Sequence, residues 1–171
     1  MLARIVGGVA DDWSITADTD IRPAVVDRPG WHLSISHRAD YVACAVANVA
    51  IGIDLEHTKP GRDTGAMATF VCQADELALV SRQPPAAREW QFLSFWTLKE
   101  AHLKLRGETF DIAHLHRVQV RDVDTVEANG ISWQFNTAGM VLSLVTDAAL
   151  KAEPKTRFDT APDRVSWYRV G

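Results

Sequence analysis

Two carboxylates separated by one residue are the clearest sign of chemistry in this sequence. Asp54 and Glu56 close a short apolar run, Ile51–Glu56. Side chains two positions apart on a strand point to the same side, so both carboxylates should project together while Ile53 and Leu55 face a core. Two unit charges about 4 Å apart repel by roughly 4 kcal/mol at an effective dielectric of 20. The pair therefore needs a shared proton, a basic partner or a cation.

A third carboxylate and a lysine lie in a long helical run about forty residues further along the chain. Helical spacing extends from about Arg88 to Arg106, and Gly107 is suited to end the helix. Glu100 and Lys104 are four residues apart, so they share one helix face. This helix offers the strand a further oxygen ligand and a positive charge.

Three carboxylates of this kind are hard oxygen ligands suited to Mg²⁺. Magnesium commonly takes few protein carboxylates and completes its octahedral shell with water and substrate phosphates. A lysine nearby is a point charge matched to anionic oxygen. The alternative for the same residues is structural: solvated carboxylates at a strand end, and a surface Glu–Lys pair worth a few tenths of a kcal/mol.

Three short motifs, in this order, resemble those of the 4′-phosphopantetheinyl transferases. The motifs are Ser34–His37 (SISH), Gly52–Glu56 (GIDLE) and Trp96–Lys104 (WTLKEAHLK). The first is similar to an S-x-S-H element of the larger, Sfp-like branch of that family. The resemblance covers the chain from about Trp31 to Gly107. Enzymes of this family move the phosphopantetheine arm of coenzyme A onto a serine of a carrier protein.

The resemblance implies a role for each motif residue. Three carboxylates would hold Mg²⁺ on the pyrophosphate of coenzyme A and neutralise charge during phosphoryl transfer: Asp54, Glu56 and Glu100. Other polar groups would surround the phosphates: Ser36, His37, Lys99 and Lys104. Glu100 and Lys104 thereby count as catalytic. Family members usually continue the first motif with Ser-Gly, whereas this chain has Arg38-Ala39, and Arg38 would either add a phosphate contact or block one.

A base is also needed to take the proton of the attacking serine. The family often has an acidic residue after a Phe-Phe-like pair, and the corresponding stretch here is Phe70–Glu76. Asp75 is the first choice for the catalytic base and Glu76 the second, with a metal-bound water as an equal alternative. Both carboxylates also suit a structural role at a helix N-terminus, where the dipole favours negative charge.

The pattern of strands and helices predicts an α+β fold of small antiparallel sheets packed with helices. We expect three consecutive strands in an antiparallel meander, at 33–37, 41–48 and 50–56. Further strands are expected at 117–120, 131–136, 140–146 and 165–170, and shorter helices at 66–71 and 75–81. The strand–turn–strand patterns of 34–46 and 133–145 are similar, as the two-half architecture of the larger branch implies. We treat 1–171 as a single transferase-like domain with pseudo-halves of approximately 1–56 and 57–171.

The composition argues against several partners and compartments. The 171 residues carry a net charge of −4 with 47% hydrophobic residues, so we expect neither nucleic acid nor a membrane as a partner. No apolar run approaches the length of a membrane span, and the first ten residues, interrupted by Arg4, lack a signal-peptide pattern. Cys44 and Cys72 are not spaced as a C-x-x-C pair, and we expect two buried thiols in a cytoplasmic protein.

The segment ahead of the SISH motif is short for the larger branch of the family. About thirty residues precede the motif, whereas that branch places there a fuller half-domain that helps to grip the nucleotide end of coenzyme A. We therefore expect a member with a shortened N-terminal half and a reduced grip on the 3′-phosphate. The smaller, trimeric branch carries its metal aspartate near the N-terminus, which Asp54 does not match, so we expect a monomer.

These expectations combine into one activity with two rivals. The resemblance implies Mg²⁺-dependent transfer of 4′-phosphopantetheine from coenzyme A to a serine of an apo acyl or peptidyl carrier protein. The products would be holo carrier protein and adenosine 3′,5′-bisphosphate. The first rival is a catalytically weak member that binds carrier protein or coenzyme A without transfer. The second is a hydrolase that uses the same carboxylates on another pyrophosphate. Fatty-acid, polyketide and peptide synthesis are all compatible with these motifs.

Overall fold

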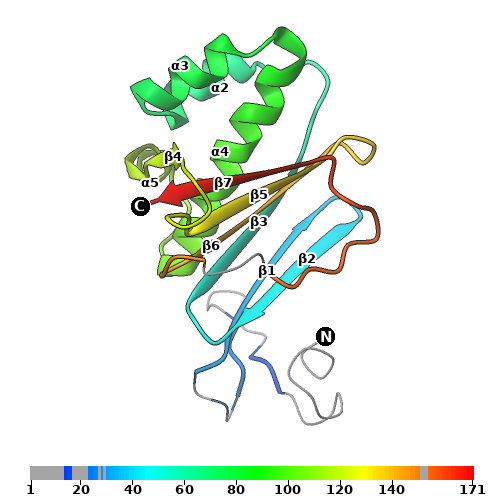
Figure 1. The fold of residues 1–171 in the computed structure, drawn as a ribbon, viewed down its shortest axis with the longest axis vertical. Helices are drawn as coiled ribbons and strands as arrows, with labels where there is room; N and C mark the ends of the chain where they lie inside the picture. The colour runs from blue at the N-terminus through cyan, green and yellow to red at the C-terminus, as the bar shows by residue number, and fades with distance from the viewer. Residues whose placement is uncertain (1–13, 17–22, 27, 29, 151–153) are drawn as a thin grey trace.

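A five-stranded antiparallel sheet with a long helix across one face forms the centre of the molecule (Figure 1). The computed structural model describes residues 14–16, 23–26, 28, 30–150 and 154–171. The strands lie in the spatial order β3-β6-β5-β7-β4, each antiparallel to its neighbour. Their bounds are Ile51–His57 (β3), Val120–Asp122 (β4), Gly130–Phe135 (β5), Met140–Thr146 (β6) and Arg164–Val170 (β7). The predicted α+β class is confirmed.

A separate hairpin of β1 (His32–Arg38) and β2 (Tyr41–Ala47) lies against the edge strand β3. The predicted meander of three strands is wrong, because β3 pairs with β6 and not with β2. Local spacing predicted each strand but could not choose the partner of β3, which comes from a strand far along the chain. β1 instead runs beside β3 in the same direction, and serine side chains of β1 accept hydrogen bonds from the backbone amides of β3.

In the part of the chain that the structure describes, four helices lie on the face of the five-stranded sheet away from β2: α2 (Thr64–Val71), α3 (Ala74–Arg82), α4 (Pro85–Arg106) and α5 (Ile112–Arg117). Proline at the first position begins α4, and Gly107 ends it with a left-handed φ of 69°. The predicted long helix and its stop are confirmed. Of the strand predicted at 117–120 only Val120 lies in a strand, at the start of β4. The short helix α5 extends to Arg117, and Asp111 caps its start by accepting from the Ala113 amide at 2.8 Å.

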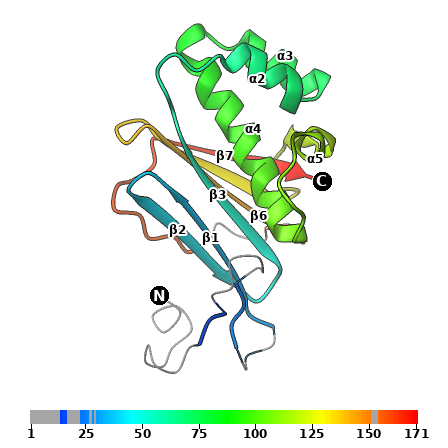
Figure 2. The same cartoon turned by 180° about the vertical axis from the view of Figure 1, so that it is seen from behind.

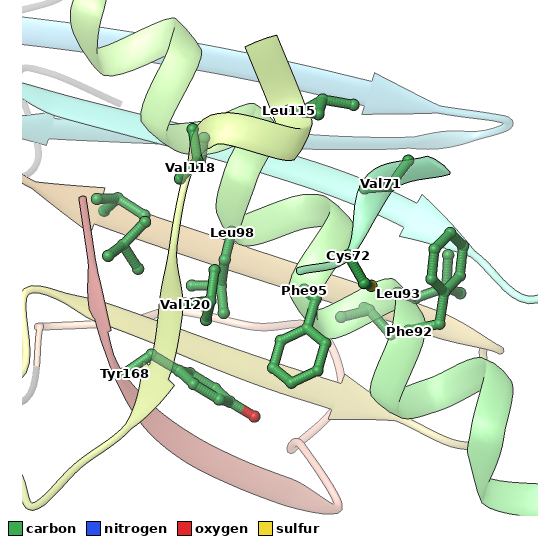
Figure 3. Packing of buried hydrophobic residues seen from close by; sticks show 14 of the residues in the cluster. Val71, Cys72, Phe92, Leu93, Phe95, Leu98, Leu115, Val118, Val120 and Tyr168 are labelled. Atoms are coloured by element: carbon green, nitrogen blue, oxygen red, sulfur yellow. The ribbon is translucent and has the colours of Figure 1, made fainter. Parts of the chain in front are cut away.

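Hydrophobic side chains fill both faces of the five-stranded sheet. On the helical face, Phe92, Phe95 and Leu98 of α4 pack with residues of the smaller helices and of β7 (Figure 3). On the opposite face, Ile53 and Leu55 of β3 join a second cluster that the small residues of β2 cover. The predicted inward orientation of these two β3 residues is confirmed. Figure 2 shows the resulting placement: α4 crosses β3 on one side, and β1 lies alongside that strand.

Two further expectations can be compared with this fold. Hairpins form at both of the similar sequence patterns, as β1–β2 and as β5–β6, although duplication of the chain stays a prediction. Both cysteines are free thiols, Cys72 buried and Cys44 half-buried. Burial, with a smaller effect of the Glu76 charge, raises the pKa of Cys72 to about 12. Within the described ranges, no helix is long and apolar enough to cross a membrane.

Candidate active site

Gly52 allows α4 to lie directly against β3. A Cβ atom at this position would collide with the Ala101 carbonyl oxygen and lie 2.8 Å from the Leu105 backbone nitrogen. Only glycine fits so close an approach of two backbones. Asp54 and Glu56 follow at two-residue intervals on the same face of β3, so this contact brings the helix to the predicted carboxylates. Gly52 carried no predicted role of its own within the GIDLE motif, although a lone glycine inside a strand signals such an approach.

Asp54 and Lys104 form the centre of the site. The Asp54 side chain is 3% exposed, and its Oδ1 accepts from the Lys104 ammonium at 2.6 Å and from the Ser36 hydroxyl at 2.9 Å. Lys104 also donates to Ser36 Oγ at 3.1 Å. Three residues that are distant in sequence thus meet where α4, β1 and β3 come together. Each of the three motifs thus contributes one residue to this cluster.

Glu100 adds a second carboxyl group to this centre. Burial, followed by the negative charge of Asp54, raises the pKa of Glu100 from 4.5 to about 8, against the opposing charge of Lys104. A hydrogen bond to Asp54 and the negative charge of Glu56 are smaller causes of the same rise in the Glu100 pKa. Glu100 therefore keeps its proton near neutral pH unless a cation replaces that proton.

The second oxygen of Asp54 is the feature that best fits a cation. Asp54 Oδ2 is buried and has no hydrogen-bond partner in the described part of the chain. A buried carboxylate oxygen without a partner is costly. This oxygen and the adjacent Glu100 carboxyl are hard ligands of the type that Mg²⁺ takes.

Glu56 does not complete a three-carboxylate site in this structure. Its carboxylate lies 3.1 Å from Arg38 Nε and 3.9 Å from an Arg62 nitrogen. Among the described residues, no three His, Cys, Asp or Glu side chains converge closely enough to hold a metal. The three predicted ligands therefore share one surface, but two of them face each other and the third is ion-paired with arginine.

Lys99 does not contact this surface, and its predicted role at the phosphates is wrong for this structure. The side chain is completely buried, with its Nζ 2.7 Å from Glu76 Oε2. The same nitrogen donates to the carbonyl oxygens of Val71, Leu115 and Val118 at 3.0, 3.2 and 2.7 Å. A helix turns by about 100° per residue, so Lys99 points toward the helical layer while Glu100 faces the β3 edge.

The candidate bases are likewise distant from the centre. Both oxygens of Glu76 are used inside the protein: Oε1 accepts from the Val120 amide at 2.7 Å and Oε2 accepts from the Gln73 amide at 2.8 Å. Asp75 is exposed in the first turn of α3. No hydrogen bond or ion pair within the described ranges joins Asp75 to Asp54 or Glu100. The helix N-terminus explains both carboxylates without a catalytic role.

The remaining residues of the first motif divide between the two faces of β1. Ser36 and Arg38 lie on the face toward β3, where Arg38 pairs with Glu56 and its Nε donates to His57 Nδ1 at 3.4 Å. His37 is exposed and, by strand alternation, lies on the other face. The structure therefore brings Arg38 toward the carboxylates and directs His37 away from them.

A depression of about 290 Å³ opens beside the Asp54 centre. Its lining combines charged groups with apolar surface: Glu100, Leu103, Lys104, Glu108 and Phe110. The Phe110 ring also packs against Trp96 at 5.9 Å between centroids. Such a surface suits a ligand with an anionic end and a less polar arm.

Comparison with known proteins agrees with this geometry. A family model described as the 4′-phosphopantetheinyl transferase superfamily matches residues 50–150. The chain is 37% identical over 87 residues to 4′-phosphopantetheinyl transferase psf-1 of Bacillus pumilus, a match covering 51% of this chain and 36% of that protein. It is 32% identical over 155 residues to 4′-phosphopantetheinyl transferase HetI of Nostoc sp., covering 86% of this chain and 63% of HetI.

A putative nickel insertion protein of Myxococcus xanthus is 30% identical over 158 residues, a match covering 87% of this chain and 37% of that protein. The chain thus spans between about a third and just under two thirds of the length of these relatives. The family model covers β3, α4 and the carboxylates between them. On these grounds the chain belongs to the 4′-phosphopantetheinyl transferase superfamily, with the Sfp-like enzymes.

Proposed function

We propose that this chain transfers the 4′-phosphopantetheine group of coenzyme A to a serine of an apo acyl or peptidyl carrier protein. In this reaction the serine oxygen attacks the phosphorus attached to the pantetheine arm. The pyrophosphate P–O bond breaks, and adenosine 3′,5′-bisphosphate leaves. The observation that carries the proposal is the Asp54–Glu100–Lys104 cluster between β3 and α4, in a chain of this family.

The cluster fits a magnesium ion with the pyrophosphate of the substrate. Asp54 Oδ2 and Glu100 would hold the ion. The Asp54 oxygen lacks a hydrogen-bond partner among the described residues, and the proton of Glu100 can be replaced by a cation. Bound there, Mg²⁺ would neutralise the negative charge that develops on the phosphoryl oxygens. Glu56 lies on the same strand face and would join only by exchanging its pairs with Arg38 and Arg62.

Lys104 and the adjoining depression would bind the substrate itself. The Lys104 side chain is 37% exposed, so its ammonium can serve Asp54 and an incoming phosphate oxygen together. Leu103 and Phe110 provide apolar contact for the pantetheine arm. The serine proton must leave as the new bond forms. Asp75, the expected base, lies outside the depression, whereas Glu100 lines it.

A catalytically weak member that binds carrier protein or coenzyme A is the second candidate. The observation in its favour is the ion pairing of Glu56 with two arginines, which leaves two carboxylates for a metal. Arg38, one of these arginines, stands where relatives usually have a small residue after the first motif. For either function we expect a monomer in the cytoplasm, consistent with two free thiols.

Incubation of the protein with coenzyme A, Mg²⁺ and a panel of apo carrier proteins separates these functions. Intact-protein mass spectrometry should show a gain of one phosphopantetheine group on a carrier, together with adenosine 3′,5′-bisphosphate. Cleavage of coenzyme A without any carrier would instead indicate a hydrolase. Binding of carrier or coenzyme A without either product would indicate the binding module and contradict the proposed transfer.

A further inference from the structure

We infer that Ser36 is a positioning residue that directs the Asp54 carboxylate, and that it does not bind phosphate. The catalytic meaning of this inference rests on the proposed function, but its geometry does not. Ser36 is 5% exposed and lies on β1, beside the edge of β3. From there its hydroxyl reaches the backbone of β3, the Asp54 side chain and the Lys104 side chain.

The Ser36 hydroxyl has no hydrogen-bonding capacity left for a ligand. A serine hydroxyl donates once and accepts at two lone pairs. Ser36 Oγ donates to Asp54 Oδ1 at 2.9 Å and accepts from the Leu55 amide at 3.2 Å and from Lys104 Nζ at 3.1 Å. A phosphate oxygen could reach this group only by displacing one of these partners, which are themselves buried or charged. The phosphate contact that the family resemblance implied for Ser36 therefore does not fit this arrangement.

The hydrogen bond from Ser36 determines which oxygen of Asp54 stays open. A carboxylate can rotate about its last side-chain bond and present either oxygen. Here both Ser36 and Lys104 donate to Oδ1, whereas the buried Oδ2 has no partner among the described residues. Lys104 alone is a flexible donor that an incoming phosphate can draw away. The short Ser36 side chain is fixed by the Leu55 amide, so it holds Oδ1 and keeps Oδ2 available.

Ser34 provides a matched control on the same strand. It is also 5% exposed, and its hydroxyl accepts from the Ile53 amide at 3.0 Å. Ser34 therefore makes the same side-chain contact to the β3 backbone, without a contact to Asp54. Comparing the two serines separates support of the β3 edge from orientation of the carboxylate.

The test compares Ser36→Ala with Ser34→Ala for thermal unfolding, Mn²⁺ binding by electron paramagnetic resonance, and kcat and KM for transfer. Both variants should lose stability, because each leaves one β3 amide without its acceptor. Ser36→Ala should lose more, because Asp54 and Lys104 also lose a partner. Only Ser36→Ala should weaken Mn²⁺ binding, by about tenfold or more, as expected when a side chain that orients a metal ligand is lost. Ser36→Thr, which keeps the hydroxyl, should restore binding toward wild type.

Equal Mn²⁺ affinities in Ser36→Ala and wild type would overturn the inference, as would equal weakening in Ser34→Ala. If Ser36→Ala does not fold, Ser36→Thr is compared with Ser36→Cys, whose thiol is a weaker donor. The Ser36→Cys variant should then bind Mn²⁺ more weakly than Ser36→Thr, and equal affinities of the two variants would overturn the inference. A wild-type protein that transfers phosphopantetheine without binding Mn²⁺ would disprove the inference alone. Serine-dependent Mn²⁺ binding without any transfer would disprove the proposed function alone.

Discussion

Two hydrogen-bond donors and a second carboxyl group surround the Asp54 carboxylate. Ser36 and Lys104 donate to Oδ1, while Glu100 brings a second carboxyl group to the same buried place. Low local polarity strengthens each of these interactions. A cation entering the cluster must therefore displace the proton of Glu100, and the pH dependence of the protein's stability should reveal that proton.

The free energy of unfolding of the metal-free protein should fall as pH rises between about 4.5 and 8 through Glu100. Its pKa is about 8 in the folded chain against an ordinary 4.5, so the folded state binds more protons across this range. One proton accounts for at most about 1.4 kcal/mol per pH unit. The contribution of the Glu100 proton to stability is complete below the ordinary pKa of 4.5 and is lost above the folded-state pKa of about 8.

Urea unfolding at pH 5, 6, 7 and 8 in the presence of a chelator measures this effect. Glu100→Gln removes the titrating group, so its free energy of unfolding should fall less steeply with pH than that of the wild type. Glu108→Gln, at an exposed position on the same depression, serves as the control and should retain it. Parallel pH profiles for wild type and Glu100→Gln would show that Glu100 does not hold the proton.

At the scale of elements, the site depends on how closely α4 can approach β3. Gly52 permits that approach, and Lys99 fixes the far side of the same helix to α2, to α5 and to Val118 directly after α5. The carboxylates and Lys104 are thus held in place by two structural contacts, one at Gly52 and one at Lys99. Loss of either contact should lower the stability of the protein.

Gly52→Ala should separate α4 from β3 and impair both stability and the site. The new methyl group would meet the backbone of Ala101 and Leu105, which cannot move aside as a side chain can. We expect a loss of about 1–3 kcal/mol, typical of overpacking, and weaker Mn²⁺ binding. Gly65→Ala is the control, because its nearest atom lies at 3.7 Å on an Asp63 side chain. Unchanged unfolding of Gly52→Ala would contradict the close approach.

Lys99→Met should destabilise the protein far more than Lys104→Met on the same helix. Loss of Lys99 leaves the buried Glu76 carboxylate without its cation, and breaking a buried ion pair costs about 3–5 kcal/mol. Lys104 is 37% exposed, so solvent compensates part of its loss. Urea unfolding of both variants measures the difference. Similar midpoints would contradict a structural role for Lys99, and a transfer defect confined to Lys104→Met is the expected functional counterpart.

At the scale of the whole molecule, local patterns predicted the elements better than their partners. The period of α4 and its glycine stop, and the alternation of β3, depend on neighbouring residues and were confirmed. The pairing of β3 with β6 depends on residues far apart in sequence, and the expected meander was wrong. A family pattern indicated that Lys99 is important, but only its burial shows that this importance is structural.

In the candidate site, too, sequence motifs predicted some features, whereas others depend on packing between distant parts of the chain. The resemblance implied that the motif residues would surround one substrate, and in the structure Ser36, Asp54 and Lys104 contact one another. It could not predict that Glu56 would pair with Arg38 and Arg62, because Arg62 belongs to no motif. Hydrogen-bond saturation of Ser36 likewise depends on the sideways placement of β1 against β3. Such details follow from packing in three dimensions, which spacing along the chain does not describe.

The measurement that tests the central claim most directly is the transfer rate of Glu100→Gln at saturating Mg²⁺ and coenzyme A. Holo carrier formation is followed by mass spectrometry, with Glu108→Gln as the control from the same depression. We expect Glu100→Gln to fold and to lose at least about 100-fold in kcat/KM, about 2.7 kcal/mol of transition-state stabilisation, while the control stays near wild type. Transfer by Glu100→Gln at the wild-type rate would contradict the assignment of this cluster as the catalytic centre.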